Sequence, residues 1–83
     1  PSQAIRLKEI RLHFDKMMSA LGERERKIIN MRYGLDGEKK HTFAEIGREL
    51  GITRERVRQL EAKAILKLRK TEHFKEVQSF FEI

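Results

Sequence analysis

The chain has 83 residues, including 19 Lys or Arg, 13 Asp or Glu and no Cys, and its formal net charge is +6. This length suits one small domain, and the absence of cysteine excludes disulfides and thiolate metal sites and favours a reducing cytosol. No apolar run reaches the roughly 20 residues of a membrane span, so we expect no membrane partner, and the N-terminus lacks the apolar core of a signal peptide. Because the chain starts at proline and not at methionine, we expect it to be a piece of a longer protein.

The positive charge is concentrated in one segment. Residues 54–70 contain seven basic and two acidic side chains, a net charge of +5, whereas the rest of the chain is close to balanced. A basic stripe on a single element favours a nucleic acid as the partner, or less often an anionic membrane surface.

Apolar residues recur at helical spacing almost everywhere, which predicts an all-α domain of about five helices. The first two helices are expected at about 3–20 and 23–33, with Ser2 as a candidate N-cap of the first. Gly22 separates them, and Gly34 fits a left-handed cap at the end of the second. The first helix has an expected buried stripe of Ile10, Phe14, Met17, Met18 and Leu21.

The segment 42–61, TFAEIGRELGITRERVRQLE, is typical of a helix-turn-helix. Thr42 and Glu45 have the spacing of a capping box at the start of a short helix over 43–50. Gly47 suits a close crossing of two helices, and Gly51 suits the positive φ of the turn between them. A shared core is expected from Ile46, Leu50, Ile52, Val57 and Leu60. The alternative is a plain helical hairpin with an incidental glycine.

A long helix is expected from its N-cap at Thr53 to about residue 70, with an inward seam of Val57, Leu60, Ala64 and Leu68. In a helix-turn-helix, the first turns of this second helix enter the major groove. The candidate base readers there are Arg54, Glu55, Arg58 and Gln59. Arginine can donate two hydrogen bonds to guanine, glutamine can pair with adenine, and glutamate can accept from cytosine. Each charge alone is more simply explained as a solvated side chain, but a carboxylate in a basic face weighs against that explanation for the group.

The stretches YGLDG and TFAEIGRELGITRERVRQLEAKAILKLRK closely resemble region 4, the C-terminal domain of the sigma-70 family of bacterial RNA polymerase sigma factors, over about residues 21–70. The resemblance implies a fold of the winged-helix-like, sigma region 4 type, which recognises the minus-35 promoter element in double-stranded DNA as part of RNA polymerase holoenzyme. It also implies docking on the flap of the polymerase β subunit and on an activator or anti-sigma protein.

The resemblance assigns base contacts to Arg54, Glu55 and Gln59, with Arg58 beside them. It places phosphate contacts at Arg24, Arg32, Thr42, Phe43, Ala44, Thr53 and Arg56. Regulators are expected at Lys63, Leu66 and Lys67. Leu66 departs from the family's usual basic residue, which fits a hydrophobic spot for a different partner. After Lys70 the common His-Pro-Ser run is missing, so we expect a different junction to the last helix. These departures leave open whether the chain comes from a primary or an alternative sigma factor.

A last amphipathic helix is expected over about 72–82, with Thr71 as its N-cap. Candidate contacts of the flap or another partner are Ile28, Ile29, Met31, Tyr33, Phe74, Val77, Phe80 and Phe81. Most of these residues are equally expected in the core, whereas Phe80, Phe81 and Ile83 are expected to be partly exposed.

The sequence favours a binding protein over an enzyme. Its histidines, His13, His41 and His73, lie far apart in the sequence, and no catalytic, cofactor or metal motif appears. Two other binding functions stay open. One is a dimeric helix-turn-helix regulator that reads a palindrome, and the other is a protein-interaction domain whose basic face binds an activator or anti-sigma protein. A regulator is expected to be a dimer by itself, whereas a sigma domain is expected to be a monomer.

Overall fold

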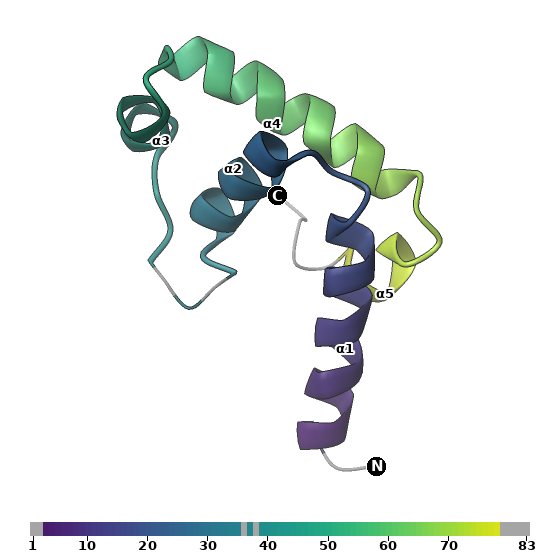
Figure 1. The fold of residues 1–83 in the computed structure, drawn as a ribbon. Coiled ribbons are helices and arrows are strands. Elements are labelled where there is room, and N and C mark those ends of the chain that lie inside the picture. The colour runs from purple at the N-terminus through teal and green to yellow at the C-terminus, as the bar shows by residue number, and fades with distance from the viewer. Residues whose placement is uncertain (1–2, 36, 38, 79–83) are drawn as a thin grey trace.

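The computed structural model describes residues 3–35, 37 and 39–78, and this part of the chain is all-α, as predicted, with no strand. Its five helices appear in chain order in Figure 1: α1 (Gln3–Met18), α2 (Glu23–Tyr33), α3 (Phe43–Leu50), α4 (Arg54–Arg69) and α5 (Phe74–Val77). The molecule is elongated, with extents of 44 × 26 × 23 Å. Among the described residues, no helix is long and apolar enough to cross a membrane.

Helices α2 and α3 pack mainly against α4, whereas α1 and α5 pack mainly against each other below its C-terminal end (Figure 1). The predicted seam of α4, Val57, Leu60, Ala64 and Leu68, is buried along the whole helix. The first half of this seam packs in one cluster with Ile28 of α2 and Ile46 of α3. The second half packs with residues of α1, the α1–α2 connection, α2 and α5: Phe14, Met17, Met18, Leu21, Ile29 and Val77. Since the adjacent residues Ile28 and Ile29 enter different clusters, α2 joins the two cores.

The helix-turn-helix is formed by α3, α4 and the turn between them. Thr42 Oγ1 accepts from the Glu45 N–H at 3.1 Å, and Glu45 Oε1 accepts from the Thr42 N–H at 2.8 Å, so the predicted capping box is present. The hydrogen bond that the Thr42 N–H donates to the carboxylate is the main cause that lowers the pKa of Glu45. At the turn, Gly51 has a φ of 72°, and at the next helix Thr53 Oγ1 accepts from the Arg56 N–H at 3.0 Å. The local sequence signals therefore define this motif correctly.

Gly47 lies where the chain after α3 passes closest to that helix. A Cβ atom at this position would stand 2.6 Å from the carbonyl oxygen of Ile52, and the Ile52 N–H donates to the Gly47 carbonyl at 2.9 Å. The crossing therefore leaves no room for a side chain, and the interior glycine is not incidental.

The ends of the chain differ from the sequence-based expectation. α1 ends at Met18, short of residue 20, and the last helix begins at Phe74. The prediction that Thr71 caps the last helix is wrong, because its Oγ1 donates back to the carbonyl of Leu68 at 2.8 Å. Thr71 thus helps to terminate α4, and His73 occupies the N-cap position of α5. The predicted Ser2 cap, the helix beyond residue 78, and the exposure of Phe80, Phe81 and Ile83 lie outside the described residues.

Candidate nucleic-acid interface

The four candidate base readers share one exposed face of α4. Arg54, Glu55, Arg58 and Gln59 are all exposed, whereas Val57 between them is completely buried. Residues at these spacings lie on one side of a helix because neighbours three and four positions apart come together. The buried seam fixes the orientation of α4, so the opposite face presents its polar side chains to solvent as a group.

Glu55 and Arg58 are already paired within this face. Arg58 Nε donates to both carboxylate oxygens of Glu55 at 3.0 Å, and Nη2 donates to Oε1 at 2.6 Å. The hydrogen bonds from Arg58 lower the pKa of Glu55, and the same carboxylate raises the pKa of Arg58. The pair keeps Glu55 ionised and holds the Arg58 guanidinium in one orientation, so the face is partly ordered before any ligand arrives.

A second, looser contact joins Arg56 and Gln59. Arg56 Nη1 donates to Gln59 Oε1 at 3.5 Å, the upper limit for a hydrogen bond. Both side chains are exposed, so this contact is easily exchanged. Arg56 can then turn to a phosphate while the Gln59 amide meets a base edge.

Two helix N-termini complete the interface. The first N–H groups of a helix lack intrahelical acceptors, and together with the helix dipole they attract phosphate. The N-terminus of α3 is formed by Thr42, Phe43 and Ala44, and that of α4 begins at Thr53. Thr42 and Thr53 are exposed, and Phe43 and Ala44 are half-buried, so their backbone and not their side chains suits a phosphate.

Comparison with known proteins agrees with this geometry. The family model "Sigma-70, region 4" matches residues 17–70, which is more than half of the chain and includes the whole helix-turn-helix. The chain belongs to the sigma-70 region 4 family.

The curated relatives are named as RNA polymerase sigma factors, either SigA or RpoD. "RNA polymerase sigma factor SigA" of Lactococcus lactis subsp. cremoris is 42% identical over 71 residues, 86% of this chain and 20% of the relative. SigA of a Bacillus species is 37% identical over 82 residues, 99% of this chain and 22% of the relative. "RNA polymerase sigma factor RpoD" of Helicobacter pylori strain 26695 is 41% identical over 76 residues, 90% of this chain and 11% of the relative. The chain thus spans 11–22% of the length of these relatives.

Arg32, a candidate phosphate contact in this region 4 domain, has partners within the protein. Its guanidinium carbon lies 4.2 Å from the centre of the Phe43 ring, and Nη1 donates to the His41 carbonyl at 3.4 Å. Nε lies 3.9 Å from Glu61 Oε2. These contacts fix the segment that leads into α3, so Arg32 positions the α3 N-terminus. Arg24 is exposed in the first turn of α2, on a different helix from the base readers.

The three candidate regulator contacts lie in different environments. Lys63 is exposed, and Leu66 is 59% exposed, which is unusual for a leucine. Lys67 instead donates from Nζ to Glu25 Oε1 at 2.8 Å. The sequence placed Glu25 at a helix start and Lys67 at a regulator surface, and only the packing of α2 on α4 brings them together.

The candidate flap contacts need a correction. Ile28, Ile29 and Val77 have no exposed surface, because they fill the two cores, so they cannot contact a partner in this conformation. Met31, Tyr33 and Phe74 are partly buried against these cores. Tyr33 also donates to Glu61 Oε2 at 3.2 Å, and burial together with that carboxylate raises its pKa to about 12. Phe80 and Phe81 lie outside the described residues.

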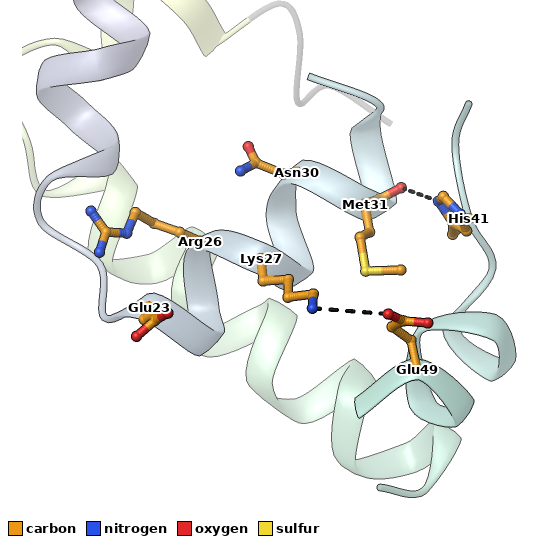
Figure 2. Close-up of a pocket in the computed structure, with 7 residues that line it drawn as sticks. All are labelled: Glu23, Arg26, Lys27, Asn30, Met31, His41 and Glu49. Carbon is orange, nitrogen blue, oxygen red and sulfur yellow. Dashed lines mark hydrogen bonds and ion pairs between the residues drawn. The ribbon is translucent and has the colours of Figure 1, made fainter. Parts of the chain in front are cut away.

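Two clefts open on α2. The first cleft has a volume of about 580 Å³ and lies between α2 and the segment 41–49. It is lined mainly by polar side chains, and Lys27 Nζ lies 4.0 Å from Glu49 Oε1 across it (Figure 2). In Figure 2, the His41 ring lies beside the last turn of α2, where Nδ1 is 3.3 Å from the Met31 carbonyl oxygen. The other cleft, of about 590 Å³, lies between α1 and the end of α2, and its apolar lining is Ile10, Phe14, Met18, Tyr33 and Leu35. Sequence patterns did not predict this apolar cleft, because it depends on how α1 meets α2.

Proposed function

We propose that this domain binds double-stranded promoter DNA as part of a bacterial RNA polymerase holoenzyme, and that α4 reads the minus-35 element in the major groove. The observation that carries the proposal is the exposed face of α4, where Arg54, Glu55, Arg58 and Gln59 lie together opposite a buried seam. The names of the curated relatives support the polymerase context. The domain works without a cofactor and without catalysis, in the bacterial cytoplasm.

The contacts divide into base reading and positioning. Arg54, Glu55 and Gln59 read bases, and Arg58 acts beside Glu55 as its paired cation. The remaining candidates hold the phosphates that set register: Arg24, Arg32, Thr42, Phe43, Ala44, Thr53 and Arg56. Arg32 contributes mainly by fixing Phe43 and the start of α3, because its guanidinium is already engaged there.

The same domain docks on protein partners through other surfaces. The apolar cleft between α1 and α2 suits a helix of the polymerase β-flap, since an amphipathic helix is commonly bound in such a groove. Of the partly buried flap candidates, Tyr33 lines this cleft, whereas Met31 lines the polar cleft and Phe74 packs against the core cluster that contains Phe14. Lys63 and Leu66 are exposed for an activator or anti-sigma protein. The domain itself acts as a monomer.

The test is binding of the 83-residue chain to two labelled duplexes at fixed low salt, measured by fluorescence anisotropy. One duplex contains a TTGACA-like element, and the other contains the same bases in scrambled order. We expect tighter binding to the element. Equal, salt-sensitive binding to both duplexes would leave only a basic surface and contradict base reading by α4. Sedimentation of the free chain separates the proposed monomer from a dimeric regulator.

A further inference from the structure

Two histidines that are distant in sequence meet between α1 and the start of α5. His13 lies in α1 and His73 immediately precedes α5, 60 positions later. Their Nδ1 atoms are 3.1 Å apart, and their ring centres are 5.2 Å apart at an interplanar angle of 45°. Both side chains are half-buried. Neither residue belongs to the DNA-binding face or to the apolar cleft.

This distance fits two ligands of one metal ion. Zinc binds imidazole nitrogen at about 2.0–2.1 Å in tetrahedral geometry, which sets two ligand nitrogens about 3.3–3.4 Å apart. The square-planar geometry of copper or nickel brings neighbouring nitrogens closer, to about 2.8–2.9 Å at similar bond lengths. The observed 3.1 Å lies between these values. A small rotation of either ring therefore satisfies both kinds of geometry.

A carboxylate next to the pair favours the tautomer that a metal requires. Glu72 Oε1 lies 3.8 Å from Nε2 of His73, on the side of the ring away from His13. A carboxylate at this position attracts a hydrogen on Nε2, which leaves the lone pair of Nδ1 directed at His13. Metal-bound histidines commonly donate a hydrogen bond to a carboxylate at their other nitrogen, and the exposed Glu72 side chain must approach by about 1 Å to accept one.

We propose that His13 and His73 bind a divalent transition-metal ion of the zinc, nickel or copper class through their Nδ1 atoms. The ion links α1 to α5, which are joined otherwise by apolar packing of residues such as Val77. Within the described ranges, no group of three or more acidic or histidine side chains is placed to hold a metal. Water therefore completes the coordination, and binding is reversible. Imidazole selects against magnesium and calcium, which prefer oxygen ligands.

The first test is thermal unfolding of the 83-residue chain with ZnCl₂ or NiCl₂, and with MgCl₂ as the reference ion. At about tenfold excess over the dissociation constant, we expect zinc or nickel to raise Tm by roughly 5–10 °C and magnesium to have no effect. His13→Gln and His73→Gln should each remove this shift. His41→Gln is the matched control and should retain it, since His41 lies on the other side of the fold beside Met31. A shift that persists in His13→Gln or His73→Gln, or the absence of any shift in the parent chain, would overturn the proposal.

The second test needs no substitution, and so it does not depend on the folding of a variant. Substoichiometric paramagnetic CuCl₂ is added to the parent chain, and the imidazole signals are followed by NMR. We expect the signals of His13 and His73 to broaden first, before those of His41. Equal broadening of all three histidines, or no broadening, would overturn the proposal.

Discussion

The carboxylate of Glu25 accepts a 2.8 Å hydrogen bond from the ammonium of Lys67, which ties the first turn of α2 to the C-terminal half of α4. Glu25 is only 8% exposed and also accepts from the Gly22 N–H at 3.2 Å. Lys67 reaches solvent with part of its side chain. One carboxylate therefore caps α2 and anchors α2 to α4, so Lys67 contributes to the stability of the fold.

Lys67→Met should destabilise the domain because it leaves the Glu25 carboxylate without its cation. We expect a loss of about 1–2 kcal/mol in the free energy of unfolding, less than for a fully buried pair because Lys67 is partly solvated. Urea denaturation measures this loss. Lys70→Met is the matched control, since Lys70 is exposed at the end of the same helix and has no part in the electrostatics of Glu25. Equal losses in the two variants would show that the pair contributes nothing specific.

The same pair predicts a dependence of stability on pH. The hydrogen bond from Lys67 is the main cause that lowers the pKa of Glu25. A carboxyl whose pKa is lower in the folded state than in the unfolded state stabilises the protein fully above the unfolded value, about 4.3 for glutamate. This stabilisation is lost as the pH falls through the lower, folded value.

Denaturation of the Glu25→Gln variant between pH 6 and about pH 3 tests that dependence. We expect Glu25→Gln to be less stable than the parent chain at pH 6, and the difference to shrink on acidification. Glu9→Gln, an exposed change on α1, should follow the parent at every pH. A difference between Glu25→Gln and the parent that stays constant down to pH 3 would contradict the assignment.

Features that depend on nearby residues were easier to predict from the sequence than features that depend on distant residues. The caps at Thr42 and Thr53 and the seam of α4 were predictable, because each depends on residues within one or two helical turns. The same periodicity predicted which face of α4 is exposed. The start of the last helix was not predictable in this way. A threonine hydroxyl can form a hydrogen bond forward, as an N-cap, or backward to a carbonyl, and Thr71 bonds backward to Leu68.

Contacts between distant segments escaped the sequence for a different reason. Glu25 and Lys67 are 42 positions apart, and His13 and His73 are 60 apart. No periodic pattern relates such residues, since their meeting depends on how whole helices pack. The burial of Ile28 and Ile29 in two separate cores has the same origin. Sequence patterns alone could not separate partner-binding residues from core residues.

Gly47→Ala should weaken the helix-turn-helix itself. The new methyl group would stand 2.6 Å from the backbone oxygen of Ile52, so the turn or α3 must shift. We expect a loss of about 1–3 kcal/mol in unfolding free energy, the usual range for an overpacked site. Gly51→Asn is the control: it tests the left-handed turn at φ 72° without a clash, and asparagine tolerates that conformation. A Gly47→Ala variant as stable as Gly51→Asn would contradict the close crossing.

Gln59→Ala should change specificity, whereas Arg56→Ala should change only affinity. Loss of the Gln59 amide removes about 1–3 kcal/mol of discrimination at one base pair. Loss of Arg56 removes a phosphate contact and weakens binding to all sequences alike. The number of counterions released on binding, measured from the salt dependence of the affinity, should fall by about one. Anisotropy titrations against single-base variants of the element measure both effects. Gln78→Ala, an exposed change after α5, is the control and should bind like the parent. If Gln59→Ala weakened binding to every duplex equally, Gln59 would not be a base reader.

Glu55→Ala should raise general affinity for DNA and lower selectivity. The change removes a negative charge from the interface and releases Arg58, whose guanidinium is held by three hydrogen bonds to Glu55. A released Arg58 can reach a phosphate, so we expect tighter binding to the scrambled duplex. The number of counterions released on binding should rise by about one. Discrimination at the base pair that Glu55 reads should fall at the same time. Glu9→Ala removes an equal charge from α1, away from the interface, and isolates the effect of net charge. If Glu9→Ala and Glu55→Ala strengthened binding to the same extent, with selectivity intact, the Glu55–Arg58 pair would have no role in reading DNA.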